Sequence, residues 1–205
     1  VREGDVVLDL GSGAGKICYI AAQIVGAKGR VLGVDFNPEM LTLARKFQGE
    51  VAEKLGYDNV TFHRGRIQDL ALPLDEADAY LKANPIRSSD DLRRYEEFAG
   101  RLRRAAPMIP NESVDVIISN CVLNLVREED REQLFREMFR VLKRGGRVAI
   151  SDIVSDEPVP EKMKQDAELW SGCIAGAFQE AAFLAAFERA GFYGIALDKY
   201  DQKPW

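Results

Sequence analysis

The segment that decides the fold of this chain is Val7-Leu-Asp-Leu-Gly-Ser-Gly-Ala-Gly-Lys16. The apolar run from Val6 to Leu10 predicts a buried strand, and three glycines follow it at alternate positions, Gly11, Gly13 and Gly15. Because glycine has no Cβ, such a turn lets a ligand lie directly against the main chain. The segment therefore predicts a strand that ends in a ligand-binding loop.

The residues after this loop complete a βαβ unit. An apolar helix is predicted from Ile17 to Val25, and a second strand from Val31 to Val34 that ends on Asp35. An acidic residue about twenty positions beyond the loop is placed to bind the hydroxyls of a ribose. We therefore expect a ligand that contains a ribose; the alternative is an ordinary tight turn with a helix-capping Asp.

The spacing of the glycines distinguishes among the known nucleotide loops. The dinucleotide fingerprint needs a glycine where Lys16 stands, and a Walker-type phosphate loop fails at Leu10 and Ile17. The remaining pattern, Asp9-x-Gly11-x-Gly13-x-Gly15, resembles motif I of the class I methyltransferases that use S-adenosylmethionine. The methionine end of that cofactor carries no pyrophosphate, so its site needs close backbone approach more than anion neutralisation.

The resemblance implies a set of cofactor-binding residues. Those of the first βαβ unit are Asp9, Gly11, Ser12, Gly13, Gly15, Asp35 and Phe36. In this fold the turn after the third strand flanks the adenine, with Ile67 over one face of the ring and Gln68 or the backbone at its edge. Asn120, at the end of the fourth strand, would contact the cofactor through its backbone.

Apolar periodicity continues the alternation of helices and strands along the chain. Helices are predicted over 38–55, 130–142 and 179–190, and strands over 60–63, 114–119, 147–154 and 193–199. Glycine after basic residues in Lys143-Arg-Gly-Gly146 indicates a helix end. The order predicts an α/β fold, with a Rossmann-like, doubly wound and mostly parallel sheet, in a single domain over residues 1–205.

Two features depart from this regular order. Residues 70–111 form an insertion of about forty residues where a short loop is usual, predicted to be a charged surface elaboration, helical from a cap at Ser89 through Arg104. Class I methyltransferases also normally have a helix before the first strand and a final antiparallel strand. We therefore expect the sequence to be truncated at both ends.

Composition is consistent with a cytoplasmic enzyme domain. The 205 residues are 46% hydrophobic and carry a net charge of −5, which argues against a nucleic-acid partner. The basic run Arg101 to Arg104 lies among acids and is interpreted as a solvated helix face. No apolar stretch approaches membrane-spanning length, so no membrane partner is expected. Three cysteines, an odd number, are expected to be reduced thiols.

Each cysteine follows the carboxyl end of a predicted strand. Cys18 lies in the first turn of the helix after the glycine loop, where helix-terminal amides are expected to lower its pKa. Cys121 follows the fourth strand and Cys173 follows the fifth. Because ligands of open α/β sheets bind at these ends, one pocket could collect all three thiols. Taken singly, each cysteine is equally compatible with a small buried core residue.

The sequence around each cysteine resembles the arsenite S-adenosylmethionine methyltransferases. The matching pieces are Gly15-Lys-Ile-Cys-Tyr19, Ser119-Asn-Cys-Val-Leu-Asn-Leu125 and Ser171-Gly-Cys-Ile-Ala-Gly-Ala177. The resemblance implies that Cys18, Cys121 and Cys173 hold arsenic(III), supplied as arsenite or its thiol conjugates. It also implies a Cys18–Cys121 disulfide during turnover, with Cys173 helping to hold arsenic, and a thiol reductant such as thioredoxin or glutathione.

The chemistry of arsenic accounts for this choice of side chains. Arsenic(III) is a soft centre that prefers sulfur ligands, and three thiolates leave its lone pair free to accept a methyl group. No general base is needed, which agrees with a chain whose only histidine, His63, has no obvious catalytic partner. Two alternatives stay open. One is a methyltransferase for a small organic acceptor with structural cysteines, and the other is a non-catalytic protein that binds thiols or metalloids.

Overall fold

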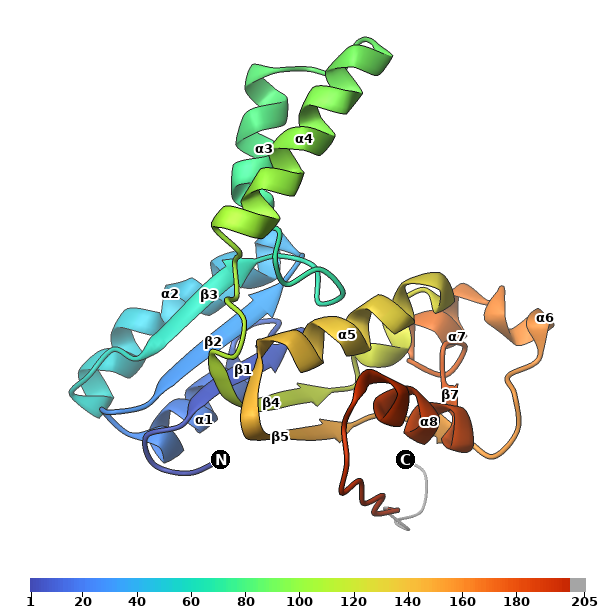
Figure 1. Cartoon of the computed structure of the whole chain (residues 1–205). Coiled ribbons are helices and arrows are strands. Elements are labelled where there is room, and N and C mark those ends of the chain that lie inside the picture. The colour runs from blue at the N-terminus through green and yellow to red at the C-terminus, as the bar shows by residue number, and fades with distance from the viewer. Residues whose placement is uncertain (200–205) are drawn as a thin grey trace.

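The computed structural model describes residues 1–199 and shows a central sheet with helices on both faces (Figure 1). Its five strands are all parallel, and they lie in the order β3-β2-β1-β4-β5. The predicted doubly wound α/β fold is therefore confirmed. The strands are β1 (Val6–Leu10), β2 (Arg30–Asp35), β3 (Val60–Arg64), β4 (Val114–Asn120) and β5 (Leu142–Ser151).

Alternate residues of the strands pack against the two helical layers, because successive side chains of a strand point to opposite faces. Val7 packs with one pair of helices, and Leu8 and Leu10 pack with the other pair. The first pair is α1 (Lys16–Val25) and α2 (Pro38–Leu55), and the second is α5 (Arg131–Val141) and α8 (Glu180–Ala190).

The order of the strands reverses beside β1. Strands β2 and β3 lie on one side of β1, and β4 and β5 lie on the other side. Ligands of open α/β sheets bind outside the carboxyl ends of the strands at such a reversal. Both the glycine loop after β1 and the Cys121 segment after β4 leave the sheet at this point.

Helix α2 has the predicted bounds because both of its ends are fixed by sequence. The side chain of Asn37 accepts the backbone N–H groups of Glu39 and Met40, at 2.9 and 3.4 Å, which caps the first turn. Pro38 occupies the first helical position, where a missing N–H costs nothing. Gly56, with a φ of +78°, ends the helix in the left-handed conformation.

The insertion forms a helical arm that stands out from the body beyond β3 (Figure 1). It consists of α3 (Leu74–Ala83) and α4 (Ser89–Ala105). Leu72, Ala77 and Ala99 form a small core of its own, and the rings of Tyr80 and Phe98 stack with their centroids 4.2 Å apart. The prediction of a partly helical insertion is thus correct, although α3 was not expected from the sequence.

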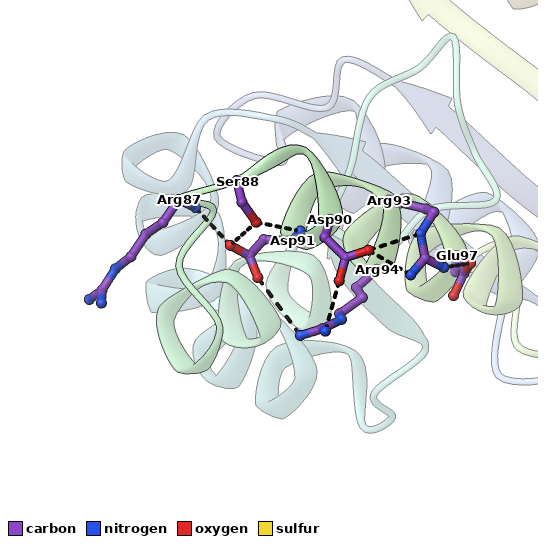
Figure 2. Close-up of polar contacts among 7 residues, drawn as sticks. All are labelled: Arg87, Ser88, Asp90, Asp91, Arg93, Arg94 and Glu97. Atoms are coloured by element: carbon purple, nitrogen blue, oxygen red, sulfur yellow. Dashed lines mark hydrogen bonds and ion pairs between the residues drawn. The ribbon is translucent and has the colours of Figure 1, made fainter.

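The start of α4 corrects the predicted cap. Ser88, rather than Ser89, accepts the N–H of Asp91 at 3.2 Å, and its hydroxyl donates back to the Asp91 carboxylate at 2.7 Å (Figure 2). Arg93 bridges Asp90 and Glu97 along the same exposed face. Such solvated ion pairs contribute only about 0–1 kcal/mol each, so they make the arm soluble rather than rigid.

The predicted strand 147–154 is divided between two sheets. β5 begins at Leu142, directly after α5, and leaves the main sheet after Ser151. The segment predicted as a helix stop, Lys143 to Gly146, therefore belongs to the strand, with an irregular register near Val114. The remaining elements are short: η1 (Leu123–Leu125), η2 (Glu128–Asp130), β6 (Val154–Ser155), α6 (Glu161–Lys164), α7 (Ala167–Ser171) and β7 (Phe178–Gln179), with β6 and β7 paired in parallel.

The predicted strand 193–199 is wrong. These residues carry alternating apolar side chains, but they take no regular structure. A groove of about 350 Å³, lined by β5 residues and by residues 192–197, lies between this segment and the sheet edge. Left-handed turns at Gly191 and Gly194 direct the chain, and Tyr193 is 88% exposed. Within residues 1–199, no helix is both long enough and apolar enough to cross a membrane.

Candidate active site

The glycine loop is folded by hydrogen bonds from its backbone to β2. The N–H groups of Gly11 and Ser12 donate to the carbonyl oxygen of Val34 at 2.8 and 3.0 Å. The φ angles of Gly11, Gly13 and Gly15 are +74°, +49° and +83°, a region that side chains with a Cβ disfavour. The predicted need for three glycines follows directly from these angles.

Asp35 is fixed beside this loop. One of its carboxylate oxygens accepts the N–H of Gly13 at 2.9 Å, and the other accepts the N–H of Asn37 at 2.8 Å. Each oxygen keeps a further lone pair, so the carboxylate can still accept hydroxyl groups. Phe36, the next residue, is 68% exposed and offers an apolar surface at the same edge of the sheet.

The loop fits a ligand with polar groups. The hydroxyl oxygen of Ser12 is buried and has no hydrogen-bond partner within residues 1–199. A buried hydroxyl normally has a partner, which a ligand would supply here. Together with the Gly13 backbone and the Asp35 carboxylate, this orphan group matches a nucleoside-bearing cofactor such as S-adenosylmethionine.

Cys18 lies beneath the loop rather than in it. It is fully buried in the core between α1 and the sheet, and its thiol donates to the Asp9 carboxylate at 3.3 Å. Burial and the nearby Asp9 charge raise the pKa of this thiol far above its ordinary value. The predicted lowering by helix-terminal amides is therefore wrong, because desolvation outweighs the amides at this depth.

Asp9 is a buried carboxyl group, and burial disfavours its charged form. Burial raises its pKa from 3.8 to about 6, and the Cys18 hydrogen bond only partly offsets that effect. Its interaction with Cys18 and its burial give it a structural role under the loop; a direct contact with the cofactor stays a prediction.

This pKa gives a testable pH dependence of stability. A carboxyl whose pKa is higher in the folded state binds protons more tightly there, so stability falls as pH rises from about 4 to about 6. The shift corresponds to about 3 kcal/mol. As pH falls across this range, we expect the free energy of unfolding of the wild type to rise by up to about 3 kcal/mol relative to that of the Asp9→Asn variant. Parallel urea-unfolding curves for the two proteins at all pH values would contradict it.

The turn after β3 lies close to the core. Ile67 is 7% exposed and packs with the apolar residues on the α5 face of the sheet, which leaves little of its surface for a ligand. The Gln68 amide is within 3.5 Å of an Asp130 carboxylate oxygen. Asn120 is exposed at the end of β4. The adenine and cofactor contacts of these three residues stay predictions.

Cys121 and Cys173 are brought together from segments 52 residues apart. The Cys173 thiol donates to the carbonyl oxygen of Cys121 at 3.0 Å. Both residues have left-handed backbone angles, with φ of +54° and +62°, which cysteine rarely adopts. Strained residues of this kind concentrate at functional sites, where the surrounding structure holds them in place.

Both thiols of this pair are protonated at neutral pH. Partial desolvation and the negative charge of Asp152 raise the pKa of the exposed Cys121, and burial, Asp152 and Cys121 itself raise the pKa of Cys173. Asp152 follows β5 and was not expected from the sequence as a site residue. The signal was present, because it is an acid directly after a strand at the carboxyl edge of the sheet.

Cys18 is not part of this pair. Asp9, which its thiol contacts, is in register with Ile118, and Cys121 lies three residues further along, about 10 Å at the rise of a strand. All three cysteines are free thiols. Within the described part of the chain, no three Cys, His, Asp or Glu side chains are grouped to hold a metal ion. The structure thus places Cys173 against Cys121 and keeps Cys18 in the core.

The strain at Cys121 can be measured. Its side chain is exposed, so replacing it removes little packing. Glycine adopts a φ of +54° without the cost of about 1 kcal/mol that a Cβ incurs there, whereas alanine keeps that cost. We expect Cys121→Gly to have a free energy of unfolding about 1 kcal/mol higher than Cys121→Ala by urea titration. Equal stability of the two variants would show that the backbone is unstrained.

Comparisons with known proteins agree with this geometry. Residues 2–191 match a family model described as a methyltransferase domain. The arsenite methyltransferase of Halobacterium salinarum is 37% identical over 199 residues, 97% of this chain and 40% of that protein. The arsenite methyltransferase of Aquipseudomonas alcaligenes is 37% identical over 190 residues, 93% of this chain and 44% of that protein.

A solved structure is similar as well. The arsenic(III) S-adenosylmethionine methyltransferase CrArsM from Chlamydomonas reinhardtii superposes with a TM-score of 0.68 at 32% identity, over 92% of this chain and 52% of that chain. The present chain spans about two fifths of the length of the curated relatives it matches.

Proposed function

Because this chain belongs to the S-adenosylmethionine-dependent methyltransferases, we propose that it transfers a methyl group to arsenic(III) held by Cys121 and Cys173. The observation that carries this proposal is the contact between the glycine loop and Val122, the neighbour of Cys121, against whose backbone the Cys173 thiol lies. A Cβ at Gly11 would lie 2.5 Å from the side chain of Val122, so the loop and the Cys121 segment are in direct contact. The proposed acceptor site and the proposed cofactor site would therefore adjoin.

The side-chain chemistry supports arsenic as the acceptor. Sulfur is the ligand that soft centres prefer, and Cys121 and Cys173, which are in contact, would supply two sulfur ligands. The relatives that match this chain over most of its length are named arsenite methyltransferases. Arsenite, or an arsenite–thiol conjugate, is accordingly the proposed substrate.

The protonated state of the thiols suits arsenous acid. Two thiols condense with As(OH)3, so that two As–S bonds form and two As–O bonds break. Each thiol proton leaves with a hydroxide as water, and no separate base is required. The product keeps a pyramidal arsenic whose lone pair is free to accept a methyl group. A third sulfur ligand can come from an external thiol, and a direct contribution from Cys18 would need it to leave the core.

The residues of the glycine loop would hold the cofactor. The positive φ angles of Gly11, Gly13 and Gly15 would shape the loop around it, Asp35 would accept hydroxyl groups and Ser12 would offer its orphan hydroxyl. When bound, S-adenosylmethionine supplies an electrophilic methyl group. The loop would orient the cofactor toward the acceptor. Positioning two reactants can lower the activation barrier by up to about 7–11 kcal/mol.

Methylation raises arsenic formally from the trivalent to the pentavalent state. Return to the trivalent state takes two electrons, which two thiols provide by forming a disulfide. Since Cys18 is a buried free thiol bonded to Asp9, a Cys18–Cys121 disulfide would require rearrangement. We therefore assign this role to an external thiol reductant such as thioredoxin or glutathione. The need for free thiols places the reaction in a reducing compartment such as the cytoplasm.

The test is product analysis by mass spectrometry. The protein is incubated with arsenite, glutathione and S-adenosylmethionine that carries a deuterated methyl group. We expect methylated arsenic with the deuterium label, and none when arsenite is omitted. A chain that binds the cofactor but labels only an added organic acceptor would overturn the arsenic proposal in favour of a small-molecule methyltransferase.

A further inference from the structure

One buried amide joins the segments that carry the two thiols. Asn124, in η1, has no exposed surface, and its Nδ2 lies within hydrogen-bond distance of three acceptors. These are the Asp152 carboxylate at 2.7 Å, the Ile153 carbonyl oxygen at 2.8 Å and the Cys173 carbonyl oxygen at 3.1 Å. Only acceptors surround this nitrogen, which fixes the orientation of the amide.

Asp152 completes the connection from the other side. One of its carboxylate oxygens accepts the backbone N–H groups of Leu123 and Asn124 at 2.9 and 3.4 Å. The other oxygen accepts the N–H of Ile153 at 2.9 Å. The end of β5 is thereby tied to the segment after β4, directly beside Cys121.

The Asn124 and Gly176 segments are in close backbone contact. A Cβ at Gly176 would lie 1.9 Å from the carbonyl oxygen of Asn124, so the two backbones touch. Arg131, from α5, donates to the carbonyl oxygens of Gly176 at 2.6 Å and Val126 at 3.1 Å. Buried polar contacts therefore hold the Cys121 and Cys173 segments together, in addition to the bond from the Cys173 thiol to the Cys121 carbonyl oxygen.

We propose that Asn124 and Asp152 are positioning residues that hold the Cys121 and Cys173 thiols at a spacing one arsenic atom can bridge. The inference rests on the proposed role of the two cysteines as arsenic ligands. A pair of linked sites gains affinity only when the geometry permits both to engage at once. Both cysteines also need external support, because each has a left-handed backbone conformation.

The test uses Asn124→Asp, which keeps the size of the side chain but replaces its donor with an oxygen. That oxygen faces the Asp152 carboxylate and two carbonyl oxygens, so the connection should open. The probe is phenylarsine oxide, an arsenic(III) compound that binds two thiols together. We expect its affinity to fall roughly tenfold or more, the advantage lost when two sites no longer act together.

A second readout separates spacing from unfolding. Iodoacetamide reacts with single thiols, so its rate at the exposed Cys121 should change little in the variant. Cys18 is fully buried and serves as an internal reporter, because it becomes alkylated only when the core opens. Peptide mapping distinguishes the three cysteines. The matched control is Asn84→Asp, the same chemical change at the end of α3 in the arm.

The outcomes are distinct. Weaker phenylarsine oxide binding in Asn124→Asp, with Cys18 still protected, supports the positioning role. Wild-type affinity in this variant overturns it and leaves the proposed function intact. If Asn124→Asp exposes Cys18, Asp152→Asn decides by the same two readouts. If phenylarsine oxide binds equally well after Cys121 and Cys173 are replaced, the proposed function is overturned, and the positioning role with it.

Discussion

Replacing Cys121 or Cys173 by serine is expected to weaken arsenite binding strongly and to remove arsenic methylation while cofactor binding persists. Each variant keeps one thiol, so the loss should be about 10²- to 10⁴-fold, the usual advantage of two linked sites over one. A serine at position 173 can still donate to the Cys121 carbonyl oxygen, so the local structure should survive. Titration with arsenite and quantification of methylated arsenic measure the two effects.

The third cysteine provides the contrast for this experiment. Cys18→Ala should retain arsenite binding, because this thiol lies in the core and contacts Asp9 rather than the other two cysteines. Its stability should fall modestly, since a small buried side chain is shortened. Arsenite binding that survives in both serine variants, or that fails only in Cys18→Ala, would contradict the assignment of the two ligands.

Gly11→Ala is expected to remove cofactor binding and to destabilise the fold. The added Cβ would lie 2.5 Å from the Val122 side chain, at a φ of +74°. The backbone strain costs about 1–2 kcal/mol and the overpacking about 1–3 kcal/mol. We expect the affinity for S-adenosylmethionine to fall roughly a hundredfold, because the loop must shift away from Val122 to make room for the Cβ. Calorimetric titration and urea unfolding measure the two quantities.

Two further variants separate the steric effect of the added Cβ from its effect on the backbone conformation. Gly49→Ala, in α2, meets no heavy atom within 4 Å and should raise stability by up to about 1 kcal/mol. The double variant Gly11→Ala/Val122→Ala relieves the steric contact but not the left-handed φ, so it should recover only part of the stability. Unchanged cofactor affinity in Gly11→Ala would exclude the loop as the binding site.

The sequence predicts the parts of the fold whose signals are local. The βαβ unit follows from alternating strand, glycine and helix patterns, and the bounds of α2 follow from Asn37, Pro38 and Gly56. The strand predicted over 193–199 fails because alternation of apolar residues requires a partner that supplies hydrogen bonds. No local pattern reports whether β5 is close enough to provide one.

The site itself depends on contacts between distant segments. The sequence predicts a site role for Cys121 from its place after β4. Its contact with Cys173 is a hydrogen bond between residues 52 positions apart, which no local pattern reports. The pKa of Cys18 is misjudged for the same reason. Its position in the first turn of α1 indicates helix-terminal amides, while only the packing shows that it faces the core and Asp9. Asn124 and Asp152 have no motif that announces their connection.

The most direct test of this account is X-ray absorption at the arsenic edge, with one equivalent of arsenite bound and no added thiol. The account predicts two sulfur neighbours on arsenic in the wild type and in Cys18→Ala, and one in Cys121→Ser. An arsenic atom with only oxygen neighbours, or with three sulfur neighbours that drop to two in Cys18→Ala, would contradict it.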